Sequence, residues 1–154
     1  NLGYKPEHVA VIRQGLVGVA KEGSAARVFA GTPYQSAGKT GTAQAVTIGQ
    51  KDKYNASKLE EHQRDHALYM AFAAAENPQI ALAIVVENAG FGAAQAAPIA
   101  RRVFDYWLLG EYPSIEDIEA SQKGLAVTPI GVKRRKEDVK LITTEGVAGL
   151  MGNR

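Results

Sequence analysis

The sequence contains no cysteine, which excludes disulfide bonds and thiolate metal sites within its 154 residues but leaves the compartment open. It also has no apolar run of the ~18 residues that a membrane-spanning helix needs, and no signal peptide opens it. Its formal net charge of +2 is too small to indicate a nucleic acid as partner. The remaining composition, with 45% hydrophobic and 22% charged residues, is typical of one globular domain or part of one.

Two helices are predicted from apolar residues at helical spacing. The first covers residues 6–22, where Pro6 suits the first helical position. The second ends near Leu109, because Gly110 follows it and favours a helix stop. The same spacing leads us to expect the two aromatic residues of this helix, Tyr106 and Trp107, in the core.

Three strands are predicted between these helices. A run rich in threonine and valine starts at Ser36, and two apolar runs follow at residues 66–75 and 79–87. The short turn at Asn77-Pro78 joins the last two runs, so they must pair antiparallel. The run at 79–87 is apolar on both faces, and we expect it to be covered on both sides. The sequence thus predicts an α+β fold, an antiparallel sheet with flanking helices.

Residues 111–154 differ from the rest of the chain. They carry seven basic and seven acidic residues and therefore no net charge. Ser114, with Asp117 three residues later, predicts a short capped helix. Periodicity is weak beyond Gln122, so we expect most of this part to be an extended or disordered tail. The predicted division is residues 1–110 as one structural unit and 111–154 as a polar, flexible C-terminal tail.

The stretch SAGKTGTAQ, residues 36–44, allows three interpretations of Lys39. A phosphate-binding loop would need a glycine where Pro33 stands and a helix directly after Thr40, and neither is present. A nucleophile at Ser36 with Lys39 as its base would need one helical turn, whereas in a strand the two side chains point to opposite faces. Both interpretations are disfavoured on these grounds.

The third interpretation places Lys39, Thr40, Gly41 and Thr42 on the edge strand of a binding cleft. An acyl transfer at a carboxy-terminal peptide bond needs a cation and hydroxyl donors for the terminal carboxylate, and a backbone N–H for the developing oxyanion. Lys39 is the cation, Thr40 and Thr42 carry the hydroxyls, and Gly41 leaves room for a substrate along the strand. We predict no cofactor and no metal for this chemistry.

Two other groups of residues could have a binding role: a histidine pair and a basic run. His62 and His66 stand at i and i+4 with Asp65 between them, a spacing that can bind a metal on one helix face. No glutamate follows the first histidine as in H-E-x-x-H, and His66 opens an apolar strand, so a metal site is disfavoured. Asp65 or His66 could instead brace the cleft, but a plain structural role is favoured over this. The basic run at residues 133–136 is followed at once by acids, which favours a solvated tail over contact with lipid or nucleic acid.

The order and spacing of AGKTGTAQ, of KYNASKLEEHQRDHALYMAFAAAENPQIALAIVVENAGFG and of a Trp-containing helix closely resemble the end of the transpeptidase domain of class B penicillin-binding proteins. The resemblance covers about residues 1–110. It implies part of the serine β-lactamase/penicillin-binding-protein transpeptidase fold, in which an antiparallel sheet lies between helical groups. In this family a serine attacks D-alanyl-D-alanine, a neighbouring stem amine takes the acyl group, and β-lactams acylate the same serine.

The resemblance also implies a role for each residue of the K-T-G strand. Lys39 would help to bind the substrate carboxylate, and Thr40 and Thr42 would hydrogen-bond it, with Gly41 between them. The backbone N–H of Thr42 would form half of the oxyanion hole. The implied partners are peptidoglycan stem peptides, β-lactam antibiotics and a membrane glycosyltransferase of the elongation machinery. The implied location is the periplasmic face of the bacterial inner membrane, with an N-terminal anchoring helix.

Two motifs of that family are missing from these residues. Apart from Ser36 there is no S-x-x-K, and no S-x-[ND] occurs. The family places both motifs upstream of K-T-G, and the chain begins at Asn1 rather than Met. We therefore expect the C-terminal part of a longer enzyme, which forms no acyl-enzyme alone. The alternative is a non-catalytic α+β module that binds a ligand or partner through the same strand, with a nucleotide-binding module more distant.

Overall fold

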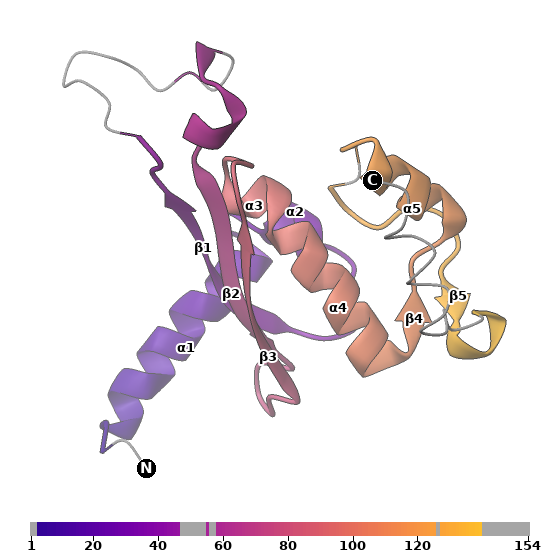
Figure 1. Ribbon diagram of the computed structural model, residues 1–154. Coiled ribbons are helices and arrows are strands. Elements are labelled where there is room, and N and C mark those ends of the chain that lie inside the picture. Colours follow the sequence, from indigo (N-terminus) through magenta and orange to yellow (C-terminus); the bar gives the residue numbers. More distant parts are fainter. Residues whose placement is uncertain (1–2, 47–54, 56–57, 126, 140–154) are drawn as a thin grey trace.

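The computed structural model describes residues 3–46, 55, 58–125 and 127–139. Its centre is an antiparallel sheet in the order β1-β2-β3, which Figure 1 shows beside the long helix α4. The strands are β1 (Ser36–Ala43), β2 (His66–Ala73) and β3 (Ile80–Val86). The predicted α+β fold with an antiparallel sheet and flanking helices is confirmed.

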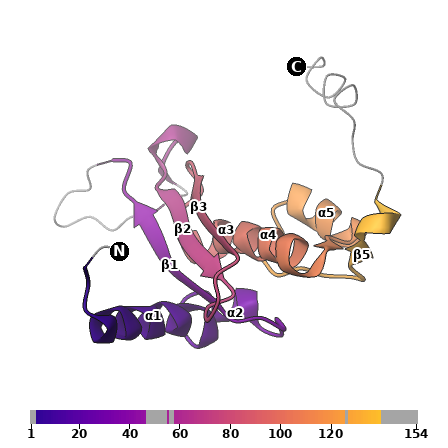
Figure 2. The ribbon, with the colours of Figure 1, turned by 90° about the horizontal axis from the view of Figure 1, so that it is seen from below.

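Four helices accompany the sheet: α1 (Pro6–Lys21), α2 (Ala26–Phe29), α3 (Gly92–Gln95) and α4 (Ala97–Leu109). The two predicted helices correspond to α1 and α4, and Gly110 ends α4 in the left-handed conformation with φ 66°. Figure 2 shows α1 on the β1 side of the molecule and α4 on the side of α5 and β5. None of the helices in the described ranges is long and apolar enough to cross a membrane.

The core lies where β2 meets α2 and α4. Phe29 packs against Tyr69 and Phe104, with ring centroids 6.1 and 6.3 Å apart. Around these rings the buried positions are mostly alanine, from both the sheet and α4. Small side chains let the helix backbone approach the sheet closely, and the three aromatic rings fill the remaining volume.

Two predictions of burial are wrong. Alternate residues of β3 are exposed, Val85 to 61%, so the strand is not covered on both sides. Trp107 is 60% and Tyr106 40% exposed, although we expected them in the core. The helical period alone does not explain the exposure of Trp107, since Trp107 stands at i+7 from Ala100 and i+3 from Phe104. It lies in the last turn of α4, after the last buried residue of the helix, Asp105.

The C-terminal segment, residues 111–139, is more structured than a tail. It contains β4 (Glu111–Tyr112), α5 (Ile115–Gln122), β5 (Arg134–Arg135) and the 3₁₀ turn η3 (Lys136–Asp138). The predicted cap of α5 is confirmed, since the Asp117 N–H donates to Ser114 Oγ at 2.9 Å. The antiparallel pair β4–β5 was not predicted. The division at residue 110 stays a prediction, and its last part, residues 140–154, lies outside the described residues.

Candidate functional site

The K-T-G residues lie on β1, which pairs with β2 on one side and has no paired strand on its other side within the described ranges. Side chains alternate along a strand, so Lys39 and Gly41 share one face and Thr40 and Thr42 the other. Lys39 is exposed, whereas Ser36 is buried at 2% exposure on the opposite face. The geometry therefore agrees with the rejection of Ser36 as a nucleophile activated by Lys39.

The free edge of β1 also carries backbone donors. Gln35, directly before the strand, accepts a hydrogen bond through its carbonyl from Ala75 N at 2.7 Å and so faces the β2 side. The direction of the backbone groups alternates from one residue to the next. We infer that the N–H groups of Thr40 and Thr42 point toward the free edge, where a ligand can reach them.

Thr40 is held from two directions. Its carbonyl accepts a hydrogen bond from Lys39 Nζ at 2.7 Å, and its Oγ1 lies 2.9 Å from Ser24 Oγ, in the turn between α1 and α2. Ser24 carries no signal in the sequence, because a lone serine in a polar link forms no recognisable pattern. The tertiary structure thus adds a second hydroxyl beside the K-T-G threonine.

Glycines let the neighbouring elements approach this strand. A Cβ on Gly92, the first residue of α3, would collide with Leu68 O and would lie 2.6 Å from Gly41 O. A Cβ on Gly38 would lie 2.6 Å from the Tyr69 hydroxyl. Real Cβ atoms do not approach so closely, so both positions require glycine for packing. The start of α3 therefore lies directly on the backbone of the K-T-G strand.

Asp65 and His66, at the start of β2, make hydrogen bonds to residues that follow β1 and β3. Asp65 accepts hydrogen bonds from Ala45 N through its side chain (3.3 Å) and from Gly90 N through its carbonyl (2.7 Å). His66 Nδ1 accepts from Asn88 N at 2.9 Å. His62 lies in the 3₁₀ turn η2 (Glu61–Gln63). Nowhere in the described part of the chain do three or more histidine, cysteine, aspartate or glutamate residues gather as metal ligands.

A buried ion network lies behind the start of β1. Asp105 on α4 accepts from Arg101 Nε at 2.9 Å, from the Tyr34 hydroxyl at 2.7 Å and from Lys133 Nζ at 2.9 Å. Arg101 also donates to Val28 O at 2.9 Å. Burial and the neighbouring Asp105 carboxylate raise the pKa of Tyr34 well above its ordinary value, so its hydroxyl remains a donor. Asp105 thereby joins α4, the entry to β1 and the C-terminal segment.

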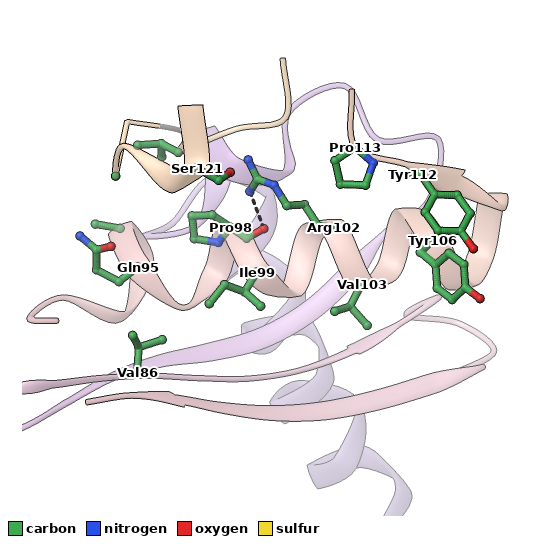
Figure 3. A pocket seen from close by; sticks show the side chains of 13 residues that line it. Val86, Gln95, Pro98, Ile99, Arg102, Val103, Tyr106, Tyr112, Pro113 and Ser121 are labelled. Atoms are coloured by element: carbon green, nitrogen blue, oxygen red, sulfur yellow. Dashed lines mark hydrogen bonds between the residues drawn. The ribbon is translucent and has the colours of Figure 1, made fainter. Parts of the chain in front are cut away.

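A separate cleft of about 750 Å³ lies between α4 and the C-terminal segment (Figure 3). Ile99, Val103 and Tyr106 of α4 form one wall, and Tyr112 belongs to the other. Arg102, at the same cleft, is held by a bidentate ion pair with Asp117 and donates to the backbone. None of the four K-T-G residues lines this cleft, so it does not belong to the site at the β1 edge.

Comparison with known proteins identifies this architecture. Residues 1–105 match the family described as penicillin binding protein transpeptidase domain, and the chain belongs to this family. It is 46% identical over 110 residues to the peptidoglycan D,D-transpeptidase MrdA of Acinetobacter baumannii, covering 71% of this chain and 16% of that protein. The resemblance inferred from the sequence is confirmed.

Two solved structures show the same fold. The chain aligns with Pseudomonas aeruginosa penicillin-binding protein 2 in complex with WCK 5153 at a TM-score of 0.55 and 38% identity, over 68% of this chain and 20% of that one. It aligns with Helicobacter pylori penicillin-binding protein 2 in complex with MreC at 0.53 and 26% identity, over 68% and 18%. The chain spans about 15–20% of the length of these curated relatives.

Proposed function

We propose that this chain forms the K-T-G side of the active site of a peptidoglycan D,D-transpeptidase, as the C-terminal part of its catalytic domain. The observation that carries the proposal is the open edge of β1 in a member of this family, with Lys39 exposed and the Thr40 and Thr42 backbone directed outward. Along this strand the chain offers N–H donors at the edge, the Lys39 cation on one face and threonine hydroxyls on the other, which are the kinds of group that a bound peptide carboxylate and oxyanion require.

In the proposed reaction a serine from another part of the protein attacks the carbonyl between the two D-alanines. The C–N bond breaks, the terminal D-alanine leaves with a proton on its amine, and a neighbouring stem amine takes the acyl group. Lys39 and the hydroxyls of Thr40 and Thr42 hold the terminal carboxylate, and the Thr42 N–H stabilises the oxyanion. Ser36 is too deeply buried to replace the missing nucleophile, so the chain alone forms no acyl-enzyme.

The proposed ligands are peptidoglycan stem peptides and the β-lactams that mimic them. The proposed protein partner is a membrane glycosyltransferase of the elongation machinery, with no nucleic acid involved. We place the protein at the periplasmic face of the inner membrane, anchored by an N-terminal helix outside these residues. The similarity to relatives named peptidoglycan D,D-transpeptidase supports stem peptides as the ligand.

Labelling with a fluorescent penicillin tests the proposal. The full-length protein should form a stable covalent adduct, and the 154-residue chain should form none. In the full-length protein, Lys39→Met should slow acylation about 100-fold, because it removes a charged donor that aids the transition state. An adduct on the isolated chain would contradict the assignment. A folded full-length protein that is never labelled would favour the non-catalytic binding module.

A further inference from the structure

We propose that Ser24 is a positioning residue for the carboxylate subsite: its hydroxyl donates to Thr40 Oγ1 and so reserves the Thr40 proton for the ligand. The inference rests on the proposed function above. Its starting point is the 2.9 Å contact between the two hydroxyl oxygens, 16 residues apart in the sequence. Either oxygen can be the donor in the free protein.

The backbone that carries Ser24 is firmly held at the end of α1. Gly23 N donates to Gly18 O at 2.8 Å, and Ala25 N donates to Val19 O at 3.0 Å, so hydrogen bonds lie on both sides of the serine. Ala25 is fully buried, and a Cβ on Gly23 would lie 2.9 Å from Val19 Cα. The serine hydroxyl is therefore presented to Thr40 from a fixed position rather than from a loose loop.

A bound carboxylate decides the direction of the hydrogen bond. A hydroxyl has one proton and two lone pairs, whereas a carboxylate only accepts. When Thr40 donates to the carboxylate, its oxygen can still accept, and Ser24 is the hydroxyl in place to donate to it. Hydrogen bonds in such a chain polarise one another, so the Ser24 donation strengthens the bond from Thr40 to the anion.

The contact also selects the orientation of Thr40. A threonine side chain has few χ1 rotamers, and a hydrogen-bond partner at Oγ1 favours one of them. The backbone of Thr40 is held separately through Lys39 Nζ. Ser24 therefore controls the side chain of Thr40, while the lysine contacts its carbonyl. Because Ser24 acts through Thr40, its loss should affect only ligands that carry the carboxylate.

The test uses two variants of the full-length protein that differ in one hydroxyl, Ser24→Thr and Ser24→Val. The second-order rate of acylation is measured with benzylpenicillin and with its methyl ester. Ser24→Val should slow acylation by the acid about three- to tenfold, the effect of one hydrogen bond, and leave the ester unchanged. Ser24→Thr should react as the wild type does. In a Thr40→Val background, Ser24→Val should have no further effect.

The outcomes separate the two proposals. A folded wild-type protein that is not acylated would overturn the proposed function. A wild type that is acylated, with Ser24→Val equal to Ser24→Thr, would overturn the role of Ser24 alone. Equal losses for acid and ester, or additive losses with Thr40→Val, would do the same, because they would indicate a general structural effect. Thermal unfolding of each variant checks that it is folded at the assay temperature.

Discussion

The two sides of α4 are joined to the rest of the molecule by opposite means. Toward the sheet, Ala97, Ala100 and Phe104 are completely buried among small and aromatic residues. Toward the C-terminal segment, Asp105 and Asp117 are buried and bound by positive partners. The contact with the sheet depends on close packing, so an added atom should destabilise it. The contact with the C-terminal segment depends on charge pairing, so the loss of one charged partner should destabilise it.

The largest effect is expected from breaking the charged side. Asp105→Asn keeps the shape of the side chain but leaves Arg101 buried without its counter-charge. Removing one partner of a buried ion pair costs about 3–5 kcal/mol of unfolding free energy. Urea unfolding of the chain measures this loss of unfolding free energy. Glu119→Gln, at an exposed position, is the control for the simple loss of a charge. If the two variants unfold at the same urea concentration, the network does not hold α4 to the C-terminal segment.

A smaller loss is expected on the packed side. Gly92→Ala adds a methyl group against the backbone of Leu68 and Gly41, which cannot move aside without disturbing the sheet. We expect a loss of about 2–3 kcal/mol by the same measurement. The matched control is Gly15→Ala in α1, where an added Cβ would meet no described atom within 4 Å apart from its chain neighbours and the nearby helix backbone. That variant should gain roughly 0.5–1 kcal/mol through helix propensity, so opposite signs are expected. Equal effects would show that contact with the strand is unimportant.

The smallest effect is expected from a buried polar group on the packed side, the hydroxyl of Tyr69. The Tyr69 hydroxyl is buried and has no hydrogen-bond partner in the part of the chain that the structure describes. Tyr69→Phe should leave stability unchanged or raise it by about 1 kcal/mol, since no bond is lost. A clear loss of stability would reveal an unseen partner of this hydroxyl.

The same tyrosine predicts an alkaline pH dependence. Burial raises the pKa of Tyr69 to about 12, whereas in the unfolded chain it is about 10. Below pH ~10 the tyrosine keeps its proton in both the folded and the unfolded state, so the unfolding free energy does not depend on its titration. As the pH rises from ~10 toward about 12, the unfolded state releases this proton first, and the unfolding free energy falls. Unfolding free energies between pH 9 and 12 should therefore fall less steeply in Tyr69→Phe than in the wild type. If the unfolding free energy falls equally steeply with pH in both proteins, the buried Tyr69 hydroxyl does not titrate in this way.

Sequence patterns predicted the local elements well because their signals are local. The stop of α4 at Gly110 and the cap at Ser114 depend on neighbouring residues and were confirmed. Burial was harder to predict, since alternate residues of β3 and the side chain of Trp107 are exposed. The link between Tyr34 and Asp105 spans 71 residues, and no local pattern contains such information.

By itself, the sequence determined the family, the α+β order of elements and the K-T-G strand as the candidate site. These depend on motif spacing and on hydrophobic period, which are properties of the chain as written. Only the tertiary structure brought Ser24 to Thr40, laid Gly92 on the strand and paired Lys133 with Asp105. Such contacts arise when distant segments share one core, because packing volume and charge pairing are satisfied in space and not along the chain.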